Sequence, residues 1–321
     1  MKVLDFTRPV IVYHRKDPDG WFSNAVCRHH LRQHGAAPET IRSIGWEYRD
    51  PTPDVGDASV VFLVDISCEG LQSDPAMADR LVWIDHHISA IKQWGETLPG
   101  LRVDGVGACR LAWHWWTRDP LAMHALEPPR VDWAKQQEGE PYLVFLVGLR
   151  DAWRHVGTEH EGWCEAVCLG LYSPTAYDME GYLGADGYKQ GMDLASIIRN
   201  ASVLGQYLGE VRRQDALEAG MLRFWEGILW LCLNTQARGS GVLTEAALRA
   251  GVKVEGLCVW SVNAKGRCAV RMYHAPGHEH LDLSKIATAR GGGGHRGACG
   301  FETDPAEWLN SLTNTRPLVV V

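Results

Sequence analysis

The sequence lacks the long apolar runs and the positive charge that mark a membrane protein or a binder of long nucleic acid. No segment approaches the roughly 18 consecutive apolar residues of a membrane-spanning helix. Residues 1–14 have neither the apolar block nor the small-residue cleavage site of a signal peptide. The formal net charge of -7 would repel a long polyanion. We therefore expect a cytoplasmic protein with no membrane and no long nucleic acid among its partners.

The sequence also lacks a disulfide or zinc pattern. Its nine cysteines are odd in number, scattered, and contain no C-x-x-C pair. Cys164 and Cys168 would share a helix face, but two thiols do not complete a zinc site and no matching pair lies nearby. We expect reduced cysteines in the core. With 321 residues, of which 45% are hydrophobic and 22% charged, the chain has the composition of a soluble globular protein with room for two domains.

Short apolar runs alternate with amphipathic segments in the first half of the chain, as in βαβ proteins. The apolar runs predict buried strands at residues 9–14, 58–67 and 80–87. The amphipathic spacing predicts helices at residues 21–35, 106–116 and 141–153. Continuous apolar strands separated by helices predict an α/β fold, with a mainly parallel sheet and helices on both faces. Ligands are expected outside the carboxyl ends of such strands.

The last third of the chain changes character. Residues 190–225 have helical spacing and few breakers, which is typical of a bridging helix or linker. After it, apolar runs predict strands at residues 228–234 and 317–321, and a hairpin within residues 256–274 that turns at residues 263–266. The predicted order is a first α/β domain, a bridging helix and a smaller C-terminal α/β domain, at residues 1–189, 190–225 and 226–321.

Chemically active side chains follow the predicted strands. The stretch "HRKDPDG" after the first strand supplies His14, Asp17 and Asp19. The same stretch is also good turn chemistry, and Asp19 could cap the helix expected near Trp21. Asp65 follows the second strand, where an acid can equally be a helix cap or a loop residue. Because the carboxyl ends of parallel strands meet at one edge of a sheet, we expect these side chains to lie together.

A third strand ends in "IDHH" and a later helix carries "RDAW". These stretches complete a set of oxygen and nitrogen ligands without a thiolate, which suits hard or borderline ions such as Mn²⁺ or Mg²⁺. The four carboxylates of this set can neutralise close to four positive charges, which favours two ions over one. The candidate metal ligands are His14, Asp17, Asp19, Asp65, His86 and Asp151.

A run of four glycines occupies residues 291–294. Without side chains, the backbone N–H groups there can approach an anion, and the two residues that follow add side-chain donors. A flexible linker is the alternative interpretation. The flanking sequence runs from an expected helix into an expected strand, which favours a rigid loop that binds a ligand. The residues expected to bind substrate there are Gly292, Gly293, Gly294, His295 and Arg296.

The stretches "YHRKDPDG", "VDIS", "IDHH" and "RDAW", in this order, resemble the four motifs of the DHH phosphoesterase superfamily. The stretch "ARGGGGHRGACGF" (289–301) resembles the glycine-rich signature of the C-terminal domain that accompanies it. That domain occurs in the subgroup of oligoribonucleases, phosphoadenosine-phosphate phosphatases and RecJ-like exonucleases. The matched stretches span residues 14–301, so the resemblance covers nearly the whole chain.

The resemblance implies how two Mn²⁺ ions would share these ligands. In the family pattern, one ion is held by His14, Asp17 and Asp65. The second ion is held by Asp19, Asp65, His86 and Asp151, so that Asp65 bridges the two. Mg²⁺ or Co²⁺ are the alternative ions.

The resemblance also implies roles for residues outside the ligand set. Asp85 would orient a ligating imidazole, and His87 would face the substrate phosphate or the leaving oxygen. Arg271 resembles the arginine that binds substrate phosphate in the second domain of the family. Without the resemblance, an arginine on an exposed strand face would be the simpler interpretation.

The sequence therefore predicts a metal-dependent phosphoesterase that hydrolyses short RNA or DNA oligonucleotides or small nucleotides, by two-metal activation of water. A cyclic-dinucleotide phosphodiesterase and a pyrophosphatase remain alternatives within the same chemistry. A non-hydrolytic nucleotide-binding or regulatory module is the alternative from another class. A homodimer remains open.

Overall fold

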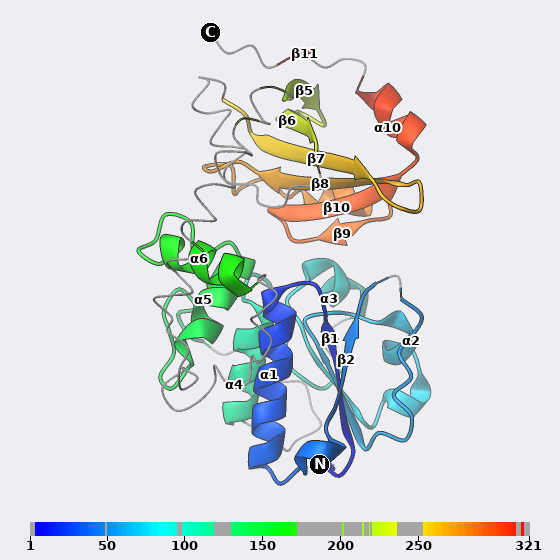
Figure 1. The fold of residues 1–321 in the computed structure, drawn as a ribbon, viewed down its shortest axis with the longest axis vertical. Helices are drawn as coiled ribbons and strands as arrows, with labels where there is room; N and C mark the ends of the chain where they lie inside the picture. Colours follow the sequence, from blue (N-terminus) through cyan, green and yellow to red (C-terminus); the bar gives the residue numbers. More distant parts are fainter. Residues whose placement is uncertain are drawn as a thin grey trace. The chain divides into compact units, whose positions relative to one another are not determined.

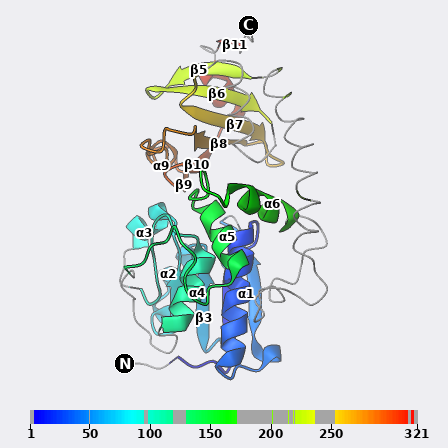
Figure 2. The same cartoon turned by 90° about the vertical axis from the view of Figure 1, so that its left-hand side faces the viewer.

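The computed structural model divides into two compact units, Met1–Ser202 and Val203–Val321. Figures 1 and 2 show the elements of each unit. Within the part of the chain that the structure describes, no helix is long and apolar enough to span a bilayer. The described residues are 4–48, 50–94, 98–118, 130–171, 201, 214, 218, 220–235, 253–312 and 316–317.

The first unit contains a parallel sheet of four strands in the order β2-β1-β3-β4. Every residue of β3 and β4 is buried, as expected for strands covered on both faces. The predicted strands at the start of the chain are confirmed, and the α/β fold class with them. The strands are β1 (Pro9–His14), β2 (Arg42–Trp46), β3 (Val60–Val64) and β4 (Leu81–Ile84).

Helices cover both faces of this sheet. Alternate strand residues such as Ile11 and Phe62 pack with one set of helices, while Val10 and Leu63 pack with the other. Figure 1 shows α1 and α4 on one side of the strands and α2 on the opposite side. The first set is α1 (Pro18–Gln33), α4 (Ala108–Arg118), α5 (Tyr142–Asp151) and α6 (Glu161–Leu171), and the second is α2 (Glu69–Gln72) and α3 (Ile88–Trp94).

Helix α1 begins three residues before the predicted start at Trp21. Pro18 occupies the first turn, where its missing N–H costs nothing. The side chain of Asp17 accepts a 3.0 Å hydrogen bond from the backbone N–H of Gly20 and so caps the helix. The cap is therefore Asp17 and not Asp19, which was the residue considered for this role from the sequence.

The second unit contains a mixed sheet in the order β11-β5-β6-β7-β8-β10-β9, in which β6 and β7 are parallel and the other pairs antiparallel. Helices α9 (Ser284–Thr288) and α10 (Pro305–Ser311) cover the core on one face. The predicted hairpin turning at residues 263–266 is β7 and β8. The strands are β5 (Met221–Trp225), β6 (Ile228–Asn234), β7 (Gly256–Val262), β8 (Cys268–His274), β9 (Gly293–Gly294), β10 (Ala298–Thr303) and β11 (Arg316–Pro317).

Most of the predicted linker at residues 190–225 lies outside the described residues. Its last residues form β5, so the sheet of the second unit starts before residue 226, where the sequence placed the domain. The reason is a tight turn: Glu226 and Gly227 both have positive φ and connect β5 directly to β6, as in a two-residue hairpin loop. Of the strand predicted at residues 317–321, only Pro317 is described, at the end of β11.

Candidate metal centre

The carboxyl ends of three strands bring polar side chains to one edge of the first sheet. His14 is the last residue of β1, Asp65 directly follows β3, and Asp85 directly follows β4. Asp19 in the first turn of α1 and Asp151 at the end of α5 reach the same place. The six candidate ligands predicted from the sequence thus fall into two converging groups.

The first group is His14, Asp17 and Asp65. The Nδ1 atom of His14 lies 2.5 Å from Asp17 Oδ2 and 3.6 Å from Asp65 Oδ2. Asp65 Oδ2 is buried and has no hydrogen-bond partner among the described residues. A buried carboxylate oxygen of this kind is costly unless a cation or a donor pairs with it.

The second group surrounds the imidazole of His86, which is fully buried. Its Nε2 atom lies 3.2 Å from Asp65 Oδ1, 3.5 Å from Asp19 Oδ2 and 3.1 Å from Asp151 Oδ2. A single ring N–H can donate to one of these carboxylates well, but not to three. Ligand atoms that share one ion at about 2.0–2.2 Å lie roughly 3 Å from one another, so these separations fit a divalent cation.

The two carboxylate oxygens of Asp65 face different groups. Oδ1 faces His86 in the second group, and Oδ2 faces His14 in the first. Asp65 has φ of 58°, a left-handed conformation that is uncommon for residues other than glycine and most accessible to Asp and Asn. This backbone turn after β3 places the carboxylate between the two groups, as a bridging ligand requires.

The loop between β1 and α1 is held close to the end of β1. A Cβ on Gly20 would lie 2.0 Å from the backbone oxygen of His14, so only glycine fits there. Asp19 is buried, and its two oxygens accept hydrogen bonds of 2.6 Å and 2.8 Å from the backbone N–H groups of Ala108 and Cys109. Asp19 therefore also caps α4 and ties the loop to that helix.

The electrostatics of the edge favour added positive charge. Burial and then the Asp17 carboxylate raise the pKa of Asp65 well above its ordinary value. Burial and then the carboxylates of Asp65 and Asp151 raise the pKa of Asp19 likewise. Burial opposes the charged form of His86, but the surrounding carboxylates outweigh it and raise its pKa. Bound cations would relieve the repulsion between these carboxylates and would replace the protons that the imidazoles hold.

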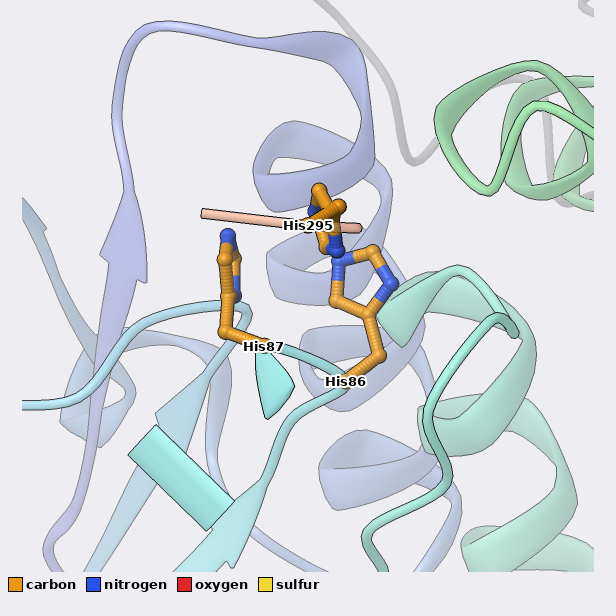
Figure 3. A group of neighbouring side chains, drawn as sticks. All are labelled: His86, His87 and His295. Atoms are coloured by element: carbon orange, nitrogen blue, oxygen red, sulfur yellow. The ribbon is translucent and has the colours of Figure 1, made fainter. Parts of the chain in front are cut away.

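Asp85 and His87 form a hydrogen-bonded pair inside a third group, in which they converge with Asp65 and His86, the four ligand atoms lying within 4.8 Å of one another. Asp85 is fully buried, and its Oδ1 lies 2.7 Å from His87 Nδ1 and accepts the backbone N–H of His86 at 2.7 Å. Figure 3 shows the imidazoles of His86 and His87 projecting from the chain after β4. The expectation that Asp85 orients a ligating imidazole needs correction: it orients that of His87, because the chain turns back within two residues.

Sequence reasoning missed the contribution of β2. This strand lies beside β1, and the two residues after it, Glu47 and Tyr48, reach His14. The Oε1 atom of Glu47 lies 3.2 Å from His14 Nε2, and the Tyr48 ring lies edge-on to the same imidazole with the ring centroids 6.2 Å apart. The strand is partly polar, so the apolar pattern did not reveal it.

In the second unit, Arg271 of β8 lies opposite Gly300 of β10, and Gly300 lies opposite Gly293 of β9. Paired positions share a face of the sheet, so the arginine side chain lies on the same face as two positions without side chains. The Nη1 atom of Arg271 is buried and has no hydrogen-bond partner within the described residues. The phosphate-binding role that the family resemblance implies for Arg271 stays a prediction.

The glycine run is an ordered turn, and part of its expected role is corrected. Gly291 has φ of 73°, and the N–H of Gly292 donates to Ala287 O at 2.9 Å, which ends α9 in a Schellman motif. The backbone N–H of Gly292 is therefore not available for an anion. Gly294 has φ of 128° and pairs with Cys299 in β10.

The residues after the glycines are also held by backbone hydrogen bonds. His295 N–H donates to Ala298 O at 2.7 Å, and Arg296 O accepts from Leu283 N–H at 2.8 Å. The Arg296 side chain is exposed, with Nε 4.0 Å from Asp282 Oδ2. These backbone hydrogen bonds fix the chain at His295 and Arg296, whose side chains stay candidate donors to a substrate.

A scan against protein-family models and a search of curated proteins found no match for this chain. A search of solved structures did find similar folds. A DHH-domain structure, described as a member of a family of ribosomal proteins, matches with a TM-score of 0.56 at 14% identity, over 96% of this chain and 85% of its own. An exopolyphosphatase-related protein from Bacteroides fragilis matches with a TM-score of 0.52 at 12% identity, over 95% of this chain and 89% of its own.

These matches cover both units. Because their sequence identities are low, they show a similar fold and nothing further. They agree with the parallel sheet of the first unit and the mixed sheet of the second. They agree with the fold that the resemblance of the sequence motifs implied. The chain has the DHH-domain fold.

Proposed function

We propose that this chain is a metal-dependent phosphoesterase that hydrolyses short oligonucleotides or small nucleotides. The observation that carries the proposal is the pair of converging ligand groups joined by the two oxygens of Asp65. Four carboxylates and two imidazoles, without a thiolate, suit Mn²⁺, with Mg²⁺ or Co²⁺ as alternatives. The proposed ligands are His14, Asp17 and Asp65 for one ion, and Asp19, Asp65, His86 and Asp151 for the other.

Divalent ions bound there would supply Lewis-acid activation of water and of the phosphoryl oxygens. The chain's own residues would orient the His87 imidazole and supply a proton to the leaving oxygen. Asp85 holds the imidazole of His87 through its Nδ1 atom at 2.7 Å. Burial opposes the charged form of His87, but Asp85 outweighs it and raises its pKa. A protonated His87 can donate a hydrogen bond or a proton to the leaving oxygen.

The second unit would bind a phosphate of the substrate. Arg271 offers a guanidinium whose buried Nη1 atom has no hydrogen-bond partner among the described residues, on the sheet face shared with Gly293 and Gly300. Guanidinium groups bind phosphate oxygens in a bidentate manner. His295 and Arg296 would add donors. A net charge of -7 supports a short substrate over a long polyanion. The cytoplasmic location and the homodimer stay predictions.

The test is hydrolysis of a substrate panel with Mn²⁺, Mg²⁺, Co²⁺ or EDTA. The panel contains RNA and DNA oligomers of graded length, phosphoadenosine phosphate, cyclic and linear dinucleotides, pyrophosphate and polyphosphate. We expect metal-dependent turnover that is fastest on the shortest oligomers or on a small nucleotide. No turnover of any member by protein with bound metal would reject the phosphoesterase proposal and favour a binding module.

Two matched substitutions test whether the effect depends on the metal centre or on the loss of any acidic side chain. Asp65→Asn keeps the side-chain shape and tolerates the left-handed backbone, so we expect a folded protein that loses metal binding and turnover. Asp57 is an exposed acid after the Gly56 turn, and its side chain is 85% exposed. Asp57→Asn should leave both properties unchanged. Equal effects of the two substitutions would contradict the proposed centre.

A further inference from the structure

The edge strand β2 brings one more carboxylate to the first ligand group. β2 pairs in parallel with β1, with Trp46 opposite His14. The ladder continues for one residue, since Arg15 N–H donates to Trp46 O at 3.3 Å. Glu47 therefore leaves the sheet directly beside His14. None of the ligands proposed above comes from this strand.

The contacts of Glu47 hold it against the imidazole. The residue is 9% exposed, its Oε1 lies 3.2 Å from His14 Nε2, and its Oε2 lies 2.8 Å from Lys16 Nζ. The backbone N–H of Glu47 donates to Asp50 Oδ2 at 3.1 Å. Asp50 in turn lies 3.1 Å from Arg15 Nη1. Both ends of the turn after β2 are thus tied to the segment that follows His14.

The two nitrogens of His14 face different partners. Nδ1 faces Asp17 and Asp65, which are the other members of the first group, and Nε2 faces Glu47. A neutral imidazole has one N–H donor and one lone pair. If Nδ1 is to bind an ion together with the two acids, the proton must be on Nε2. A buried carboxylate beside Nε2 stabilises that tautomer.

Glu47 is placed to hold the imidazole and not to bind the ion. It belongs to none of the converging ligand groups found among the described residues of the first unit. Its second oxygen is occupied by Lys16 at 2.8 Å. Lys16 thus lies where it can balance a charge on Glu47, and the Oε1 atom is left to face His14 Nε2.

We propose that Glu47 is a positioning residue that accepts the Nε2–H of His14 and so directs Nδ1 to the ion of the first group. The inference rests on the proposed metal centre and deepens it. Partners of this kind, hydrogen-bonded to a ligating imidazole, typically change metal affinity by about 10–100-fold when they are removed. The effect should be confined to the ion that His14 binds.

The test is calorimetric titration of the metal-free full chain with Mn²⁺. His14→Ala and His86→Ala assign the two binding phases. We expect Glu47→Ala to weaken the phase that His14→Ala removes by about 10–100-fold and to leave the other phase unchanged. Glu47→Gln should weaken it less, because the amide oxygen still accepts a hydrogen bond from Nε2. Glu69→Ala, at an exposed acid of α2, is the control and should change neither phase.

Three results would overturn the inference. One is unchanged affinity in both Glu47 variants, and another is an equal loss in both phases. The third is complete loss of the first phase in Glu47→Gln, as in His14→Ala, since that would make Glu47 a ligand. If Glu47→Ala does not fold, Glu47→Gln alone decides. Failure of the proposed function would be distinct, because the wild-type chain would then bind no Mn²⁺ in either phase.

Discussion

At the scale of single residues, Asp65 is costly to the metal-free protein. Burial, and then the carboxylate of Asp17, raise its pKa well above the ordinary value. A carboxyl group whose pKa is higher in the folded than in the unfolded state stabilises the fold at low pH. This stabilisation is lost as the pH rises from about 4, near the unfolded pKa, through the folded pKa. The metal-free protein should therefore be less stable at neutral pH because of Asp65.

We predict that Asp65→Asn raises the melting temperature of the metal-free protein at pH 7 by a few degrees, or roughly 1 kcal/mol. Asparagine keeps the left-handed backbone and removes the charge. The gain should shrink as the pH falls toward about 4, where the wild-type carboxyl is protonated. Thermal melts in EDTA at a series of pH values measure this. With Mn²⁺ present the order should reverse, and a variant that is less stable than wild type in EDTA would contradict the argument.

His87 offers a second prediction at this scale. Its Nδ1 atom is held by Asp85 at 2.7 Å, and it is not among the six proposed ligands, although its ligand atom lies within 4.8 Å of those of Asp65 and His86. We expect His87→Gln to keep the affinity for Mn²⁺ within about threefold and to lower kcat by about 10²–10⁴. Metal titration and steady-state kinetics on the same preparation measure the two effects. Loss of metal binding with the loss of turnover would make His87 a ligand instead.

At the scale of elements, the junction of β1 and α1 sets the geometry of the first ligand group. A Cβ on Gly20 would meet the backbone of His14 at 2.0 Å. We expect Gly20→Ala to lower the free energy of unfolding by about 1–3 kcal/mol, since the loop must shift. The affinity of the ion held by His14 should fall as well. Denaturant unfolding and Mn²⁺ titration measure the two effects.

The matched control is another helical glycine. A Cβ on Gly162 in α6 would meet no atom within 4 Å. Gly162→Ala should therefore leave metal affinity unchanged and raise stability by up to about 1 kcal/mol, because alanine has the higher helix propensity. A Gly20→Ala variant as stable as wild type, with unchanged metal affinity, would show that the loop does not depend on this close approach.

The apolar strands of the first unit could be predicted from the sequence because most of their residues are buried. β1, β3 and β4 read as continuous apolar runs. β2 could not be predicted in this way, because its burial pattern is mixed and it contains Arg42, Ser43 and Gly45. Since Glu47 follows β2, the contact with His14 was missed together with the strand. Burial of an edge strand depends on its neighbours, which the local sequence does not specify.

In the candidate site, too, some features could be predicted from the local sequence, while others depend on contacts between residues far apart in the chain. The strand-end rule predicted where His14, Asp65 and His86 meet. The identity of the cap of α1 was also local: Asp17 before Pro18 is a cap signal that the sequence contained. The capping of α4 by Asp19 joins residues 89 and 90 positions apart, and no local pattern could reveal it.

At the scale of the whole molecule, the proposed chemistry is divided between two units. All six proposed metal ligands lie in Met1–Ser202, while the arginine and the glycine turn lie in Val203–Val321. The units have separate cores, one around the parallel sheet and one around the mixed sheet. A ligand that binds only the folded state stabilises the unit that holds it. Bound metal should therefore stabilise the first unit against unfolding and leave the stability of the second unit unchanged.

We predict two transitions in calorimetric unfolding, of which Mn²⁺ shifts only one. At a free concentration of 100 times Kd, one site stabilises its unit by about 2.7 kcal/mol, because the unfolded chain does not hold the ligands together. Phe301→Ala removes a ring from the core of the second unit, so it should lower the other transition and identify it. A single transition that moves as a whole with Mn²⁺ would show that the two units unfold together, because the metal would then stabilise residues that contribute no ligand.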